Sequence, residues 1–491
     1  MRALIIVNSP KDWPFELPDV DVVSARRYLT DATYSELRGV HVFNLCKSYR
    51  YQSLGYYVSL LATARGHKPT PSLSAIQDLK AIEIVRIRSD EFDDLVQSSL
   101  KSLTSTEFVL SIYFGQNLAV RYERLSAHLF RTFGAPLLRA TFHIDADQHW
   151  NLQKIGPIAA DQIPEAHRDF VLTAARDYFS IKRHHVPKSR ATRYDLAILY
   201  DPSATDGPSD EAAIKKFCRA ANQLGMDATL VDRSDYASIA EFDALFIRET
   251  TNVNHHTYRF ARRAQAEGLV VVDDPDSILR CTNKVFLNEL LSRHRIPTPK
   301  TVVLHRDNVH LIATELGFPC ILKQPDSAFS QGVIKVQSET ELLEQADRMF
   351  NKSELIIAQS YLPTSFDWRI GIFDRKPIWA AKYHMAQGHW QIIKQGMAGR
   401  RYGRVEAVPL SEAPQVVVKT ALRSANLIGD GLYGVDVKEV GRRAYIVEVN
   451  DNPSIDSGFE DGVLKAELYR SVMQVFFDRL EHRFARHGVR R

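Results

Sequence analysis

Two carboxylates and an amide near the C-terminus have the types and spacing of a metal-binding hairpin. The stretch "GVDVKEVGRRAYIVEVN" (434–450) alternates apolar and polar residues on both sides of a turn. If the turn is symmetric about Arg442, Asp436 lies directly across from Glu448, and Asn450 points to the same face as Glu448. Facing carboxylates repel, and they repel more when half buried. The pattern predicts a hard divalent cation such as Mg²⁺ at this hairpin; the alternative is a solvated face whose polar residues serve only the turn.

Two lysines upstream could bring positive charge to an anion bound beside such a cation. Lys323 lies in the strand-like stretch "CILKQP", where a lysine between apolar residues is uncommon unless its ammonium meets an anion. Lys284 follows "CTN" at the start of a predicted helix. The alternative for both lysines is a solvated charge on a long side chain. The small, polar loop after Lys323 contains Ser330 and reaches Gly332, so its N–H groups and hydroxyls could close over phosphates.

A strand end and an arginine complete the candidate set. The apolar stretch "SELIIA" runs into four residues whose backbone groups could bond the edge of an adenine, namely Gln359, Ser360, Tyr361 and Leu362. The same stretch could equally connect two domains. In the following "FDWRI", Arg369 lies between apolar residues and favours a bidentate anionic partner. That partner could be a substrate carboxylate, a phosphate or a structural acid such as Asp367.

A second group of potential ligands lies far from these residues. The stretch "FHIDADQHW" (142–150) carries four of them at alternating positions, namely His143, Asp145, Asp147 and His149. They could line one strand face and bind a metal, but nothing nearby in the sequence supplies the rest of a site. We interpret this stretch as an exposed strand face.

Length and composition set the protein class. The chain has 491 residues, enough for about three domains at roughly 150 residues each. Hydrophobic residues make up 45% and charged residues 25%, as is typical of a soluble globular protein. The net charge of +4 is too small to indicate a nucleic-acid partner. No apolar run reaches the roughly 18 residues of a membrane helix, and the four cysteines are too widely spaced to suggest disulfides or a zinc site. We therefore expect a cytoplasmic protein without membrane partners.

The order of elements predicts α/β domains followed by an α+β body. Residues 1–185 contain strand-like and helical stretches and are followed by a polar linker. From 194 to 282 strands and helices alternate, which favours a small, doubly wound parallel sheet, with Ser209 as the N-cap of its first helix. From 283 onward the strands come in hairpin-like pairs, which favours antiparallel sheets. The last helix has one apolar face and is expected to seal the core.

In this order, the lysines, the strand end, the arginine and the acidic hairpin resemble the RimK-like ligases of the ATP-grasp superfamily. The matching stretches, within about 194–480, are "CTNKVFLNELLSRHRIPTPKT", "FPCILKQPDSAFSQGV", "IAQSYLPTSFDWRI" and "GLYGVDVKEVGRRAYIVEVNDNPSI". Residues 1–185 resemble the extra N-terminal domain of some RimK-like proteins. The implied fold is an N-terminal accessory domain (1–185), a pre-ATP-grasp domain (194–282) and two α+β subdomains, 283–362 and 363–491, that clasp ATP.

The resemblance also implies roles for individual residues. The residues implied to bind ATP are Lys284, Lys323, Ser330, Gly332, Gln359, Ser360, Tyr361 and Leu362. Those implied to hold Mg²⁺, or Mn²⁺ in its place, are Asp436, Glu448 and Asn450. Those implied to assist phosphoryl transfer are Arg369 and Lys323. Three further cations are more simply solvated charges than anion ligands, namely Lys382, Arg400 and Arg401.

The implied reaction is the ATP-driven joining of a carboxylate to an amine. The carboxylate attacks the γ-phosphoryl group, and an amine then attacks the acyl-phosphate in a site that excludes water. The expected substrates are an amino acid and a carboxylate-bearing small molecule, peptide or protein, with glutamate addition as the family-level expectation. Two alternatives stay open: an ATP-binding regulator without ligase activity, and a peptide-recruiting protein. The sequence identifies neither the substrates nor the oligomeric state.

Overall fold

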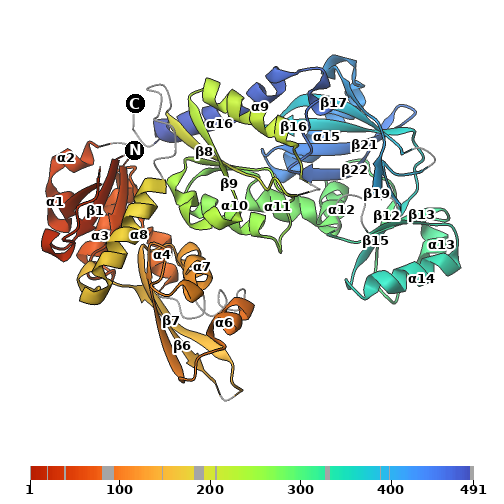
Figure 1. Cartoon of the computed structure of the whole chain (residues 1–491). Coiled ribbons are helices and arrows are strands. Elements are labelled where there is room, and N and C mark those ends of the chain that lie inside the picture. The colour runs from red at the N-terminus through yellow and green to blue at the C-terminus, as the bar shows by residue number, and fades with distance from the viewer. Residues whose placement is uncertain are drawn as a thin grey trace. The chain divides into compact units, whose positions relative to one another are not determined.

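The computed structural model (Figure 1) describes residues 2–18, 20–37, 40–79, 93–145, 147–181, 193–204, 207–326, 332–386, 389–396 and 399–486. The chain forms two compact units. Unit 1 comprises Met1–Arg190 with Arg233–Glu241, and unit 2 comprises Ala191–Asp232 with Phe242–Arg491. The segment Arg233–Glu241 lies within the domain predicted at 194–282, yet it belongs to unit 1. The other domain boundaries stay predictions.

A four-stranded parallel sheet in the order β2-β1-β3-β4 forms one part of unit 1. Its strands are β1 (Arg2–Val7), β2 (Val20–Ser24), β3 (Val40–Asn44) and β4 (Lys68–Thr70). The helices in this part are α1 (Ala25–Thr30), α2 (Ala32–Ser35), α3 (Leu54–Ala64), α4 (Leu73–Asp78) and α8 (Arg168–Ile181). Strand β3 is buried along its whole length, as expected for a parallel strand covered on both faces. Gly66 follows Arg65, the C-cap of α3, and has a φ of +70°, the left-handed conformation that a glycine adopts where a helix ends.

A three-stranded antiparallel sheet in the order β5-β6-β7 forms the other part of unit 1. Its elements are β5 (Glu107–Tyr113), β6 (Leu137–Ile144), β7 (Trp150–Pro157), α6 (Asp93–Leu100) and α7 (Glu123–Phe133). Leu125, Leu129 and Phe133 of α7 are buried in one core with Ile112 and Phe142 of the sheet. The prediction of one α/β unit over 1–185 did not include this antiparallel sheet.

Unit 2 contains the predicted small parallel sheet, in the order β11-β10-β8-β9. Its elements are β8 (Tyr194–Leu199), α9 (Glu211–Gln223), β9 (Met226–Val231), β10 (Ala244–Ile247), α10 (His256–Ala266), β11 (Val270–Val272) and α11 (Pro275–Thr282). Figure 1 shows α9 and the last helix, α16 (Ala466–Arg486), on one face of this sheet and α10 on the other. The predicted apolar face of α16 is confirmed, since Leu468, Met473, Phe476 and Leu480 are fully buried.

The predicted N-cap of α9 is wrong by one residue. The carboxylate of Asp210, not the hydroxyl of Ser209, accepts a hydrogen bond from the N–H of Ala213, at 2.9 Å. The Ser209 hydroxyl is buried and donates to the carbonyl of Ile455 at 2.8 Å. Ser209 therefore serves a tertiary contact, and the neighbouring aspartate satisfies the helix start.

Two antiparallel sheets, as predicted, make up most of the rest of unit 2. The first has the order β12-β15-β13-β14 and comprises β12 (Thr301–Leu304), β13 (Cys320–Lys323), β14 (Val333–Val336) and β15 (Ile356–Ser360). The second has the order β20-β17-β16-β21-β22 and comprises β16 (Phe366–Phe373), β17 (Lys376–His384), β20 (Val405–Val408), β21 (Tyr433–Val440) and β22 (Arg443–Asp451). A separate ribbon pairs β18 (Ile393–Gly396) with β19 (Gly399–Tyr402). The helices here are α12 (Lys284–Arg293), α13 (Ile312–Glu315), α14 (Glu339–Phe350) and α15 (Gln415–Ile428).

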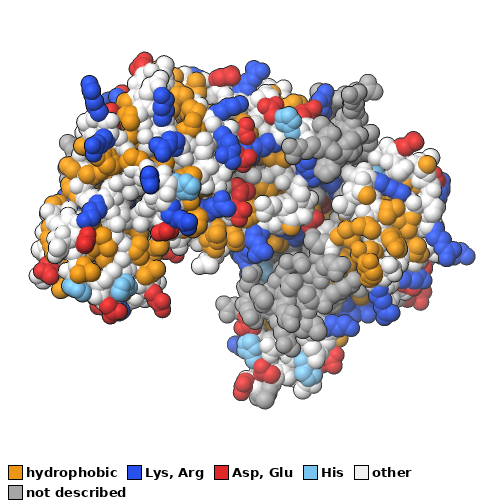
Figure 2. All heavy atoms as spheres, turned by 180° about the vertical axis from the view of Figure 1, so that it is seen from behind, with side chains coloured by type: hydrophobic (Ala, Val, Ile, Leu, Met, Phe, Trp, Pro, Cys, Tyr) orange, Lys and Arg blue, Asp and Glu red, His pale blue; other side chains and the backbone are white. Residues whose placement is uncertain are grey.

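The surface and the cysteines agree with the expectations from composition. On the face shown in Figure 2, side chains of both charge signs lie among hydrophobic ones. None of the described helices combines the length and the apolar character that crossing a bilayer requires. All four cysteines are free thiols.

Candidate active site

The acidic hairpin has the predicted pairing of carboxylates, but its turn is centred at a different position and the ladder contains a bulge. Asp436 of β21 pairs with Glu448 of β22, as the sequence analysis predicts. The turn, however, closes with the pair Val440 and Arg443, so its centre lies half a residue before the predicted one. An irregularity beside Asp436 leaves Val447 without a partner in the ladder and takes up this offset. The bulge therefore brings the two carboxylates opposite each other.

The two facing carboxylates, Asp436 and Glu448, are each neutralised by a cation from another element. Arg369 of β16 donates two hydrogen bonds to Asp436, from Nε at 2.7 Å and from Nη2 at 2.8 Å. The Lys284 ammonium, at the start of α12, lies 2.8 Å from an oxygen of Glu448. Asn450 donates from Nδ2 to Asp436 at 3.2 Å, which leaves its Oδ1 as an acceptor. Protein cations thus relieve the predicted repulsion between the two carboxylates. Five of the predicted site residues take part in these contacts, namely Lys284, Arg369, Asp436, Glu448 and Asn450.

Lys323 is the cation without such a partner. Its side chain on β13 is 8% exposed, and among the described residues its ammonium has no hydrogen bond or ion pair. The pKa of Lys323 is lowered to about 8, mainly by burial and also by Lys284 and Lys438, while Glu448 opposes this lowering in part. A buried ammonium beside two other lysines favours an anionic ligand.

These charges meet at one pocket within unit 2. Its charged and polar lining comprises Lys284, Lys323, Gln359, Ser360, Asp367, Gln391, Asp436, Lys438 and Glu448, and its other lining comprises Pro299, Ile321, Val333, Tyr361, Leu362, Met385, Trp390, Ile392 and Val447. The pocket thus collects both predicted lysines, the whole predicted strand end and both carboxylates. Arg369 is not among its lining residues, so its predicted contact with the transferring phosphoryl group stays a prediction.

The sequence analysis missed Lys438 as a site residue. Its ammonium lies 2.6 Å from Asp367 and donates to the Thr364 hydroxyl at 2.7 Å. Lys438 is two positions after Asp436 on the same strand, so strand alternation alone could have placed it beside the carboxylate. Asp367, weighed only as a partner for Arg369, pairs with this lysine instead.

The other end of the pocket is aromatic. The rings of Tyr361 and Trp390 lie edge to face with their centroids 6.1 Å apart. The ammonium of Lys335 lies over both rings, at 4.6 Å from Tyr361 and 5.7 Å from Trp390. Gln359 donates to the Thr301 hydroxyl at 3.0 Å. Aromatic rings and lysines in one pocket suit a ligand with a planar base and an anionic tail. Trp390 was not predicted, since it lies outside the regular strands.

Several other predicted residues are not brought into the pocket. Gly332 has a φ of +65°, and a Cβ there would lie 2.9 Å from Gln324 Oε1, so a glycine is required for the turn. Lys382 lies 5.2 Å from each of the rings of Phe366 and Trp368. Ser330 lies outside the described residues, as do the side chains of Arg400 and Arg401.

The donor set of the hairpin fits magnesium in its chemistry. Burial raises the pKa of Asp436, against the lowering by Arg369. Burial would also raise the pKa of Glu448, but Lys284 and Lys323 lower it overall. Two carboxylates and an amide oxygen are hard donors. Asp436 Oδ1 and Glu448 Oε1 each have one partner and keep a lone pair, whereas Asp436 Oδ2 already accepts from both Arg369 and Asn450. Across the described part of the chain, no three His, Cys, Asp or Glu side chains are grouped as a complete metal site, so a cation here would need further ligands from phosphate or water.

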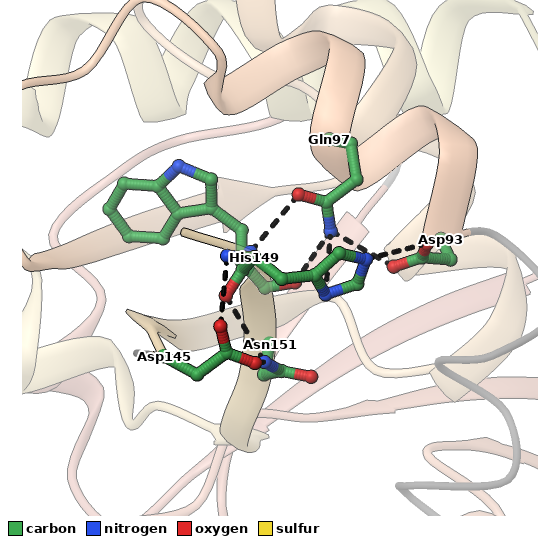
Figure 3. A network of polar contacts seen from close by, with 6 residues as sticks. Asp93, Gln97, Asp145, His149 and Asn151 are labelled. Atoms are coloured by element: carbon green, nitrogen blue, oxygen red, sulfur yellow. Dashed lines mark hydrogen bonds and ion pairs between the residues drawn. The ribbon is translucent and has the colours of Figure 1, made fainter. Parts of the chain in front are cut away.

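The stretch around His149 in unit 1 forms a turn network rather than a metal site (Figure 3). Asp145 accepts hydrogen bonds from the N–H groups of Asp147 and His149, at 3.0 and 2.9 Å. The His149 ring turns toward α6, where its Nε2 lies 3.1 Å from Asp93. His143 and Asp147 are exposed. The interpretation as an exposed strand face is correct for His143, at the end of β6, and wrong for the other three residues, which lie in the turn between β6 and β7.

Comparison with known proteins places a family match in each unit. Residues 25–174 match the RimK-like ATPgrasp N-terminal domain, and residues 281–464 match the RimK-like ATP-grasp domain. The alpha-aminoadipate–LysW ligase LysX of Saccharolobus solfataricus is 27% identical over 254 residues, which are 49% of this chain and 88% of that protein. The probable alpha-L-glutamate ligase of Syntrophotalea carbinolica is 25% identical over 220 residues, or 44% and 70% of the two chains. The solved RimK domain ATP-grasp protein of Sphaerobacter thermophilus is 17% identical with a TM-score of 0.45, covering 57% of this chain and 98% of that one.

Proposed function

Because this chain is a RimK-like ATP-grasp protein with a RimK-like N-terminal domain, we propose that it is an ATP-dependent ligase that joins a carboxylate to an amine. The observation that carries the proposal is the pocket in which three lysines, three carboxylates and an aromatic end converge. The curated relatives named above are ligases by name. As in that family, we expect the protein to act in the cytoplasm.

The pocket residues divide by the part of ATP that each would contact. The aromatic end, with Tyr361 and Trp390, takes the adenine, and the strand end from Gln359 to Leu362 supplies its polar contacts. Lys284 and Lys323 take the phosphates. Lys323 is the stronger of the two ligands, because its ammonium gives up no ion pair with a described residue to bind them.

Asp436, Glu448 and Asn450 would hold Mg²⁺, which, when bound, neutralises phosphate charge in phosphoryl transfer. Arg369 holds both oxygens of Asp436, and its guanidinium also lies 4.4 Å over the ring of Tyr383. Arg369 thereby fixes the orientation of the carboxylate, and its remaining N–H groups could reach the transferring phosphoryl group. Burial opposes the charge of Arg369, but Asp436 raises its pKa, so the guanidinium stays charged at any working pH.

The proposed reaction balances in atoms and charge. A substrate carboxylate oxygen bonds to the γ-phosphorus, and the bond from that phosphorus to the bridging oxygen of ADP breaks. The amine nitrogen then bonds to the acyl carbon, phosphate leaves, and the amine gives up a proton. An amino acid, with glutamate first among those to test, is the proposed amine, and the carboxylate belongs to a small molecule, peptide or protein.

The test is a screen for ADP release that depends on an acceptor. Purified protein with ATP and Mg²⁺ is incubated with pools of amino acids and peptides, and ADP, phosphate and product mass are measured. We expect ADP release to require both a carboxylate and an amine and to yield a product with the mass of an amide. Nucleotide binding without acceptor-dependent ADP release from any pool would favour the ATP-binding regulator, in which protein cations neutralise the two carboxylates permanently.

A further inference from the structure

Arg248, directly after β10, links the small parallel sheet of unit 2 to the segment that follows β22. It is fully buried. Its guanidinium donates to the hydroxyl of Ser209 at 2.8 Å and to the carbonyl of Pro208 at 2.5 Å. It also donates to Asn452 Oδ1 at 2.7 Å and to the carbonyl of Pro453 at 2.9 Å. Two partners thus precede α9, and the other two immediately follow β22.

All the hydrogen-bond partners of this arginine among the described residues are neutral oxygens. Burial lowers the pKa of Arg248 to about 10, and the nearby carboxylates of Asp273, Asp456 and Glu460 raise it in part. Burying the charge of an arginine costs desolvation free energy. Its planar guanidinium, however, presents five N–H donors in a fixed geometry, which no other side chain does. Arg248 therefore specifies the relative position of two backbone segments more strictly than an apolar residue of its size would.

Both the oxygen and the nitrogen of the Asn452 side-chain amide are held by hydrogen bonds. Its Oδ1 accepts from Arg248, and its Nδ2 donates to the carbonyl of Glu249 at 2.6 Å. Its backbone has a φ of +47°, in the left-handed region. The dipeptide Arg248–Glu249 thus holds a strained residue two positions after Asn450.

The constraint continues from Pro453 into the hairpin. A Cβ added to Gly434 would lie 2.6 Å from Cβ of Pro453, so the two residues are in close contact. Gly434 pairs with Asn450 in the ladder, and its carbonyl accepts from Asn450 Nδ2 at 3.3 Å. The chain of contacts from Arg248 therefore ends at the amide that also bonds Asp436.

We propose that Arg248 is a positioning residue for the metal–nucleotide site, acting through Asn452 and Pro453 to fix how the end of β22 presents Asn450 and Glu448. This inference rests on the proposed function, because it assumes that those two residues hold the metal of a metal–ATP complex. It assigns to the small parallel sheet a part in metal binding, although none of its strands lines the pocket among the residues described.

The test measures the binding of a non-hydrolysable ATP analogue by calorimetry, once with Mg²⁺ and once with EDTA. Asn452→Gly removes both amide contacts and tolerates the left-handed backbone. Arg248→Lys keeps the charge and loses the fork. For both variants we expect the gain in affinity that Mg²⁺ brings to fall by about tenfold, as for changes to the outer contacts of metal ligands, with the affinity in EDTA unchanged.

A matched control separates positioning from general destabilisation. Met226→Ala empties a fully buried position on β9 of the same sheet, so it should lower Tm without changing the effect of Mg²⁺. A wild-type effect of Mg²⁺ that is retained in Asn452→Gly overturns the inference, even if Arg248→Lys does not fold. A wild-type protein that binds the analogue equally with Mg²⁺ and EDTA overturns the proposed metal site first, and the inference with it.

Discussion

Two stretches with the same sequence signal have opposite structural meanings. The hairpin around Glu448 and the turn around His149 both carry acidic and amide or imidazole groups at alternating strand positions. In the hairpin, Asp436 and Glu448 each meet a cation from a distant element and line a pocket. In the turn, Asp145 bonds the backbone of its own loop, and His149 bonds a neighbouring helix. Alternation therefore identifies polar residues on one face, and cations from distant elements at a pocket distinguish the hairpin from the turn.

The largest effect is expected from the hairpin itself. Glu448→Gln removes one charge from the proposed metal site with little change in shape, so we expect ATP turnover to fall by about 10²–10³-fold, as for the loss of a central electrostatic contact. The measurement is ADP release at saturating Mg²⁺. His149→Gln is the matched change in unit 1, and it should keep wild-type turnover. Equal ATP turnover in the two variants would contradict the assignment of the site to the hairpin and not to the turn around His149.

Lys323 provides the next test, because its function and its stability should move in opposite directions. Lys323→Met loses an ammonium that would bind phosphate, and we expect nucleotide affinity to fall by about 10–100-fold, the equivalent of one charged hydrogen bond. The same change removes a buried charge whose pKa is lowered to about 8. The nucleotide-free variant should therefore gain on the order of 1–3 kcal/mol of stability, measured by denaturant unfolding. A variant that loses both stability and affinity would mark Lys323 as structural.

A smaller effect follows from the same pKa. Bound phosphates favour the ammonium form of Lys323, so nucleotide affinity should fall as the pH rises through about 8, by about tenfold between pH 7 and 9. Without nucleotide the sign is reversed. The unfolded chain binds more protons than the folded one between about pH 8 and the usual lysine pKa of about 10.4, so this lysine adds stability as the pH rises through that window. Calorimetric titrations at several pH values test this, and Lys323→Met should flatten the profile.

The smallest effect is expected in the turn of unit 1. Asp145→Ala removes acceptors for two backbone N–H groups and for Asn151, all at the surface, so we expect a small decrease in the Tm of unit 1 and unchanged ATP turnover. Differential scanning calorimetry and the ADP assay measure the two quantities on the same sample. A loss of turnover without a change in Tm would show that this turn contributes to function after all.

The sequence could predict the strands of the hairpin and its facing carboxylates, because alternation within one hairpin fixes which residues share a face. It could not predict their partners. Arg369 and Lys284 are 67 and 164 positions away from the carboxylates they pair with, and only packing brings them together. The bulge at Val447 was also beyond prediction, and the pairing came out right because the bulge offsets the assumed centre of the turn.

Other parts of the site differ in how far they could be read. Lys438 follows Asp436 by two positions, so the alternation that located the carboxylate also locates the lysine. Trp390 lies between β17 and β18, where no periodicity places a side chain. In unit 1 the parallel strands β1 and β3 were recognisable from their apolar stretches, whereas β4 has only three residues. The sheet of β5, β6 and β7 was not recognised; the helix α7 lies between β5 and β6, as a helix does in an α/β unit.

A crystal structure of the complex with a non-hydrolysable ATP analogue and Mg²⁺ would test most directly whether this pocket binds the metal and the nucleotide. We predict the γ-phosphate within hydrogen-bond distance of the Lys323 ammonium, the metal bound by Asp436, Glu448 and Asn450, and the base against Tyr361 and Trp390. A nucleotide bound elsewhere, or a metal that leaves the ion pairs of Asp436 and Glu448 untouched and binds neither residue, would contradict the account.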